Sequence, residues 1–184
     1  MTPPCRLRIS CLVLLALVAR GETPTSSAGP APTADRVGFP AGYVKTFPIL
    51  RVTEDIKAAK RVTVYGNTLA ASITNRSALP YPDGSVIVME STRLKKAVDG
   101  QIARDSGGHA IVDVVTGLHV MRRGKGFGEA YQTNRTGEWE YVEYRPDGSL
   151  LTPPEHSAAC AQCHVKAGPE RDFVFKARFA DTPR

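Results

Sequence analysis

Two cysteines and a histidine near the end of the chain have the spacing of a haem-attachment motif. Cys160, Cys163 and His164 form a Cys-x-x-Cys-His run, which is typical of c-type haem proteins. Two thiols must reach the two vinyl groups of one porphyrin, and an imidazole must reach its iron from the same side. Residues three and four apart lie on one face of a helix, so a helix would present these groups together. The motif predicts one covalently attached haem c, with His164 as the iron ligand.

Two other uses of a Cys-x-x-Cys pair fit less well. A structural zinc site usually takes four protein ligands, and the only other cysteines, Cys5 and Cys11, lie in a segment that we expect to be removed. A thioredoxin-like redox pair follows a strand in a βαβ pattern, which is missing here. A zinc site would have to complete its ligands from the remaining histidines, His109, His119 and His156.

The N-terminus has the pattern of a secretion signal. Arg6 and Arg8 precede an apolar run over residues 9–19 that is too short to span a membrane. We expect residues 1–28 to be a signal peptide, cleaved after residue 19 or residue 28. Residues 29–36 are expected to be a flexible linker, because residues 21–36 are rich in Pro, Thr, Ser and Ala. Residues 37–184 would form the domain, and export predicts a periplasmic protein.

The charge and hydropathy of the chain limit its partners. The formal net charge is +6, but no dense basic stripe with interleaved aromatic residues appears, so nucleic acid is not an expected partner. No later segment is apolar enough to cross a bilayer, so no stable membrane span is expected.

The remaining pattern predicts an α+β fold, mainly an antiparallel β-sheet with a few short helices. Thr53 could cap a short helix, with acids in its first turn and bases toward Arg61, and a second helix could run from Asn67 or Thr68 to about Ser77. A helix beginning near Pro153 would carry the haem motif close to the C-terminus. Residues 95–108 read as a loop. The expected strands are residues 62–65, 85–90, 110–121, 139–145 and a half-buried closing strand, 173–179.

The position of the motif narrows the class of haem protein. Only twenty residues follow His164, and none is Met or His, unlike electron-carrying cytochromes c, in which a Met ligand follows an N-terminal motif. The strands argue against the helical bundle of cytochrome c′. The chain resembles the cytochrome P-460 and cytochrome c′-β proteins over roughly residues 39–179. The resemblance is carried, besides the haem motif, by Phe39-Pro40 with Tyr43, and by residues 64–67, 82–88, 137–141 and 172–175.

The resemblance implies that His164 is the proximal iron ligand and that the distal side is open. Similar proteins bind nitric oxide or carbon monoxide there, or oxidise hydroxylamine. The hydroxylamine oxidisers carry a lysine cross-linked to the porphyrin edge, and this chain has Met89 at that position. A thioether cannot supply the nitrogen of that cross-link.

Three further residues are candidates for the site. Met89 could be a sixth iron ligand, or it could pack against the haem edge as methionine packs against irregular apolar surfaces; Met121 has the same two alternatives. Glu155 could relay protons in ligand chemistry, or it could serve only as an acid at a helix N-terminus.

Three functions remain open at this point. The first is a binding or redox haem protein that takes nitric oxide or carbon monoxide at an open site. The second is an enzyme that oxidises hydroxylamine or reduces a peroxide. The third is a six-coordinate electron carrier that uses Met89 or Met121. The expected partners are a small gaseous or nitrogenous ligand and a periplasmic redox protein, with a homodimer left open.

Overall fold

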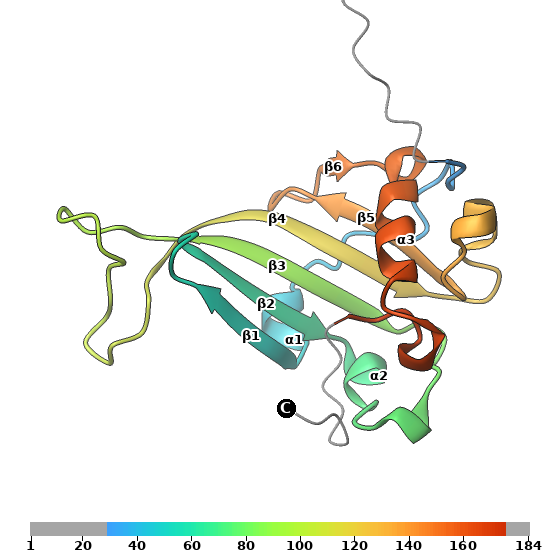
Figure 1. Cartoon of the computed structure of the whole chain (residues 1–184), viewed down its shortest axis with the longest axis horizontal. Helices are drawn as coiled ribbons and strands as arrows, with labels where there is room; N and C mark the ends of the chain where they lie inside the picture. The colour runs from blue at the N-terminus through green and yellow to red at the C-terminus, as the bar shows by residue number, and fades with distance from the viewer. Residues whose placement is uncertain (1–28, 176–184) are drawn as a thin grey trace, which may run out of the picture.

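The computed structural model describes residues 29–175, which form a six-stranded antiparallel sheet with short helices on both faces (Figure 1). Neighbouring strands follow one another in chain order. The strands are β1 (Ile49–Asp55), β2 (Lys60–Gly66), β3 (Val86–Leu94), β4 (Val112–Arg123), β5 (Trp139–Tyr144) and β6 (Leu150–Thr152). The helices are α1 (Tyr43–Thr46), α2 (Thr68–Ala71), α3 (Ala158–Val165) and the 3-10 helices η1 (Arg76–Ala78), η2 (Glu129–Asn134), η3 (Pro154–His156) and η4 (Pro169–Arg171). The predicted α+β class, with a helix near the C-terminus, is confirmed.

The central strands are covered on both sides. Val86, Ile87 and Val88 are consecutive in β3 and all buried. Side chains alternate between the two faces of a strand, so such a run needs a cover on each face. Figure 1 shows α3 in front of the sheet and α1 behind it.

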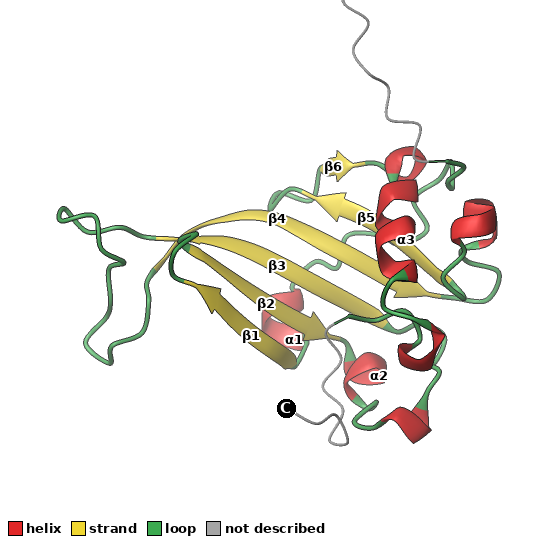
Figure 2. Cartoon of the chain, viewed as in Figure 1, coloured by secondary structure: helices red, strands yellow, loops and turns green. Residues whose placement is uncertain are grey.

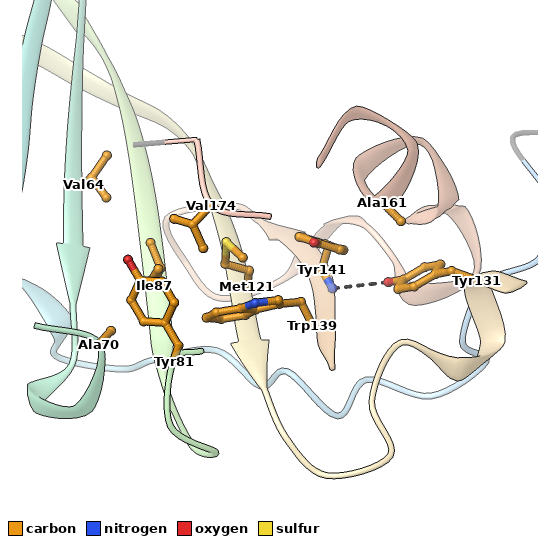
Figure 3. Close-up of a cluster of buried hydrophobic side chains, with 10 residues drawn as sticks. All are labelled: Val64, Ala70, Tyr81, Ile87, Met121, Tyr131, Trp139, Tyr141, Ala161 and Val174. Atoms are coloured by element: carbon orange, nitrogen blue, oxygen red, sulfur yellow. Dashed lines mark hydrogen bonds between the residues drawn. The ribbon is translucent and has the colours of Figure 1, made fainter. Parts of the chain in front are cut away.

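The face of the sheet under α3 carries the cluster of apolar side chains drawn in Figure 3. Trp139, fully buried, stacks edge-on against Tyr81 with ring centroids 5.5 Å apart. Ala161 of α3 is also fully buried and belongs to this cluster, so the helix is packed onto the sheet through it. The cluster consists of Val64, Ala70, Tyr81, Ile87, Met121, Tyr131, Trp139, Tyr141, Ala161 and Val174.

The opposite face is covered by the chain that leads into β1. Val37 and Tyr43 pack there against side chains of β3, β4 and β5. The Tyr43 hydroxyl donates to the buried Glu90 carboxylate. Asp35 and Arg36, inside the stretch expected to be a linker, reach the same sheet: Asp35 accepts a hydrogen bond from the Tyr144 hydroxyl at 2.6 Å, and Arg36 pairs with buried Glu140.

The helix predicted to begin at Thr53 is wrong. Residues 53–55 continue β1, and a turn follows before β2. The acids and bases that suggested a helix dipole instead face each other across a hairpin. Glu54 lies opposite Arg61 in the register, and their side chains form an ion pair at 2.7 Å. Opposite charges on paired strands stabilise a hairpin as they would stabilise helix ends, so the local pattern did not separate the two.

The second predicted helix is shorter than expected. Its predicted start is confirmed: α2 begins at Thr68, and the Asn67 Oδ1 before it accepts the Ala70 N–H at 3.0 Å. However, α2 ends at Ala71, and only η1 follows within the predicted range. The polar stretch over 95–108 is a loop, as predicted, and extends far beyond the sheet between β3 and β4 (Figure 2).

The closing strand predicted over 173–179 is not found in its described part. Residues 172, 173 and 175 lie in turns. Val174 is buried and Phe175 is exposed, so the predicted apolar face of Phe side chains does not form there. The backbone bonds locally, with Phe173 N–H donating to Gly168 O at 2.9 Å, and not to a neighbouring strand. Residues 176–179 and the predicted signal peptide, 1–28, lie outside the described residues.

Among the described helices, none combines the length and the hydropathy needed to span a bilayer.

Candidate functional site

The helix α3 carries all three residues of the haem motif and packs against the sheet. It follows η3, and Pro154 is the first residue of η3. Ser157 fixes this start: its hydroxyl donates to Pro154 O at 2.6 Å and lies 2.8 Å from the Tyr131 hydroxyl of η2. Buried Ala161 then sets which side of α3 meets the sheet.

The two cysteines are free thiols in different surroundings. Cys160 is partly buried against the apolar cluster, whereas Cys163 is exposed. Burial, followed by the nearby charges of Glu143 and Cys163, raises the pKa of the Cys160 thiol to about 11. Cys160 is therefore neutral near pH 7. A thioether is also uncharged, so conversion of this thiol into a thioether would put no charge into the apolar surroundings.

The imidazole of His164 is oriented by a backbone carbonyl. Its Nδ1 lies 2.7 Å from Phe173 O. A carbonyl only accepts, so Nδ1 carries the proton and the other ring nitrogen, Nε2, keeps its lone pair. Burial lowers the pKa of His164, partly opposed by the Phe173 carbonyl. The ring also lies against Tyr141, with centroids 4.6 Å apart. A neutral imidazole with a hydrogen-bonded Nδ1 is the usual form of a histidine metal ligand.

These donors fit a haem group. The thiols and the imidazole come from one short helix, and the sheet beneath it presents an apolar surface that includes Tyr141 and Met121. Among residues 29–175, no group of three or more His, Cys, Asp or Glu side chains is placed to hold a metal ion by itself. Two thiols and one imidazole on a single helix match the donor set of a haem that is attached through two thioethers and ligated by one histidine.

Met89 lies in a row of residues that crosses the sheet on the α3 side. It is half-buried, packs against the apolar cluster and lies opposite Val64 of β2. The structure thus brings Met89 to the same face as the haem motif. Its two predicted roles, iron ligand or packing at the haem edge, both stay predictions.

The next residues along this row were not predicted as a site. Met89 lies opposite His119 of β4, and His119 lies opposite Glu143 of β5. His119 Nδ1 and Glu143 Oε1 are 2.5 Å apart, and the Thr152 hydroxyl donates to the second carboxylate oxygen. Both groups act electrostatically on the motif, since Glu143 raises the pKa of Cys160 and His119 lowers that of His164. In the sequence, their only signal was the alternation of side chains along a strand. His119 stands two residues from buried Met121, and Glu143 stands two residues from buried Tyr141, so each faces the same side of the sheet as that neighbour.

A close polar contact joins His119 Nδ1 to the Glu143 carboxylate. Burial lowers the pKa of His119, whereas the Glu143 carboxylate raises it and Lys60 lowers it. His119 is therefore mainly neutral near pH 7 and donates its Nδ1–H to the carboxylate.

Replacing Glu143 by glutamine is expected to lower the pKa of His119 further, because the charge that favours the imidazolium is removed while the burial remains. NMR titration of the imidazole in a diamagnetic state of the protein measures this shift. The unfolded chain would then bind the proton more readily than the folded chain, so the free energy of unfolding should fall more steeply below pH ~6.5 in the variant. Glu155→Gln, at an exposed acid, is the matched control. An unchanged or raised His119 pKa in Glu143→Gln would contradict the pairing.

Glu155 lies in η3 and is exposed. It is an acid in the first turn of a 3-10 helix, and its role as a proton relay stays a prediction. Of the other histidines, His109 is exposed in the loop between β3 and β4, and His156 is exposed at the end of η3. The structure therefore brings His119 to the site but not His109.

The family model described as Cytochrome P460 matches residues 40–176. No curated protein matches the chain. The matched range includes all six strands of the described sheet and the helix with the haem motif. It begins close to the expected start of the domain. The chain therefore belongs to the cytochrome P460 family, whose cofactor is haem.

Proposed function

We propose that this chain is a periplasmic cytochrome that carries one covalently attached haem c and binds a small diatomic ligand, nitric oxide or carbon monoxide, at an open distal side. Cys160 and Cys163 would hold the porphyrin as thioethers, and His164 would be the proximal ligand. The observation that carries the proposal is the hydrogen bond of His164 Nδ1 to Phe173 O, because it leaves Nε2 as the ligating atom.

When bound, the haem supplies an iron site for a small neutral ligand. The chain supplies apolar side chains on the α3 side of the sheet: buried Val64 and Met121, with half-buried Met89 packed against their cluster. Such surroundings disfavour anions and strongly hydrated ligands, which would lose hydrogen bonds to water on entering. They do not penalise nitric oxide or carbon monoxide in this way.

A second candidate function is the oxidation of hydroxylamine or the reduction of a peroxide. The His119–Glu143 pair favours it, because this pair can hold or release a proton at His119 Nδ1 beside the haem motif. Met89 weighs against the cross-linked form of this chemistry, since the resembling oxidisers carry lysine there. A third candidate, a His/Met electron carrier with a periplasmic redox partner, would require Met89 or Met121 on the iron.

Optical spectroscopy of the purified full-length protein separates these candidates. The pyridine haemochrome should show one haem per chain that resists acid extraction. The ferrous protein should lack the strong red shift of the Soret band that marks a cross-link, and its Soret band should move when carbon monoxide or nitric oxide is added. A haem that extracts into organic solvent would refute covalent attachment. A strongly red-shifted ferrous Soret band would reveal a cross-link, and a sulfur-to-iron charge-transfer band would reveal a methionine ligand. Turnover of hydroxylamine without a cross-link would favour the second candidate.

A further inference from the structure

The carbonyl that orients His164 comes from a backbone segment in an unfavourable conformation. Asp172 (φ 47°, ψ 40°) and Phe173 (φ 61°) are consecutive and both left-handed. Side chains other than glycine disfavour this region because Cβ approaches the backbone. Two such residues in a row persist only where the surroundings hold them. Phe173 is also the residue whose carbonyl oxygen accepts from His164.

Local hydrogen bonds set the shape of this segment but not its place on the sheet. Asp172 N–H donates to Pro169 O at 2.9 Å, and Phe173 N–H donates to Gly168 O at 2.9 Å. Both bonds lie within residues 168–173. Gly168 N–H in turn donates to Val165 O at the end of α3 at 3.1 Å, so the start of the segment follows α3. None of these bonds reaches the sheet, so they do not fix how Phe173 lies on it.

The side chain of Asp172 makes the polar connection between this segment and the sheet. Its Oδ2 accepts the backbone N–H of Tyr81 at 3.0 Å and lies 3.5 Å from Arg123 Nε. Tyr81 belongs to the chain that leads into β3, and Arg123 is the last residue of β4. The side chain is only 9% exposed. Burial raises the pKa of its carboxyl, while the Tyr81 N–H and Arg123 lower it.

We propose that Asp172 is a positioning residue for the iron ligand: its carboxylate ties the Phe173 carbonyl to the sheet and so fixes the orientation of His164 and the strength of its Nδ1–H bond. The inference rests on the proposed ligation of haem by His164. A hydrogen bond to the distant nitrogen of a ligating imidazole makes that ligand more basic. A more basic ligand stabilises ferric over ferrous iron. Asp172 thereby tunes the reduction potential without touching the haem.

A purely structural ion pair with Arg123 is the alternative role. Arg123 also pairs with Asp83 and, at 3.1 Å, with Glu138. Asp83 is half-exposed, with 53% of its side chain accessible, and lies at the turn before β3. Removing the Asp83 charge disturbs the same arginine but leaves the anchor of the Phe173 segment in place. Asp83→Asn is therefore a matched control.

The test compares Asp172→Gly, Asp172→Asn and Asp83→Asn in the haem-loaded full chain. Glycine adopts the left-handed conformation freely, so Asp172→Gly removes the anchor without forbidding the backbone. Resonance Raman spectra of the ferrous protein should show a lower iron–histidine stretching frequency in this variant. Its reduction equilibrium should move about tenfold toward ferrous iron, an increase of ~59 mV for one electron. Asparagine tolerates the same backbone and still offers an oxygen to Tyr81 N–H, so it should give a smaller shift of the same sign. Asp83→Asn should give none.

Two results would overturn the inference. One is an unchanged stretching frequency and potential in Asp172→Gly, and the other is an equal shift in Asp83→Asn. If Asp172→Gly yields no folded holoprotein, Asp172→Asn decides: a shift of the expected sign supports the anchor, and no shift refutes it. Failure of the proposed function would look different, because the wild-type protein itself would then lack covalent haem or a histidine ligand.

Discussion

A chain with both Cys160 and Cys163 replaced by alanine is expected to carry no covalently bound haem. These are the two thiols of the motif, and they lie on one helix three residues apart. Without them, no thioether can form, and any remaining haem would be held by His164 and packing alone. Haem staining of a denaturing gel and acid extraction followed by the pyridine haemochrome measure this loss.

The single variants and a neighbouring residue supply the controls. Each single cysteine variant should keep at most one thioether, and the vinyl group left unreacted should shift the haemochrome absorption to longer wavelength. Gln162 lies between the two cysteines and is exposed, so Gln162→Ala should keep the full covalent haem. Covalent haem in the double variant would exclude the motif as the attachment site. Far-UV circular dichroism checks that the sheet still folds.

Replacing Trp139 by alanine is expected to lower the free energy of unfolding by about 3–5 kcal/mol. Trp139 is fully buried at the start of β5 and contacts Tyr81 edge-on. Its removal would leave a cavity in the cluster between the sheet and the segment that carries Val174 (Figure 3). Urea unfolding measures the loss. It must be followed by circular dichroism, because Trp139 is the only tryptophan of the chain.

Two variants test whether the loss comes from the cavity. Trp139→Phe keeps a ring in the same place and should cost less than the alanine variant, because a smaller cavity remains. Val52→Ala removes apolar atoms from an exposed position on β1, 51% accessible, and should change stability by no more than about 0.5 kcal/mol. Equal losses in Trp139→Ala and Val52→Ala would show that this cluster does not hold the sheet together.

The strand predictions succeeded where a run of β-branched apolar residues distinguishes a strand from other elements. The β-branched run over 85–90 falls in β3 from Val86 on, and the Val-rich run over 110–121 falls in β4 from Val112 on. Their side chains fit a buried pleated surface and few other environments. The expectation of a mainly antiparallel sheet before the haem helix depended on these runs.

Prediction failed where one local pattern satisfied two structures. The charges from Glu54 to Arg61 suit a helix dipole and equally a hairpin, and pairing with β2 decided for the hairpin. The Phe residues after Asp172 alternate as in a strand. However, the backbone N–H groups of Phe173 and Val174 donate to residues 168 and 171, at the beginning and end of the η4 turn. The Asp172 side chain is bound near the ends of β3 and β4, so no strand forms over 173–175.

The haem motif could be recognised from the sequence alone, because Cys160, Cys163 and His164 lie within five residues and one helical turn is enough to bring their side chains together. The surroundings of these three residues became known only from the folded chain. The row from Met89 to His119 and Glu143 depends on strand register, and a slip by one residue would turn each side chain to the opposite face. The carbonyl of Phe173 and its anchor Asp172 depend on contacts with Tyr81 and Arg123, far away in the chain. Such contacts leave no local pattern, because His, Glu, Asp and Arg side chains are also common on solvated surfaces.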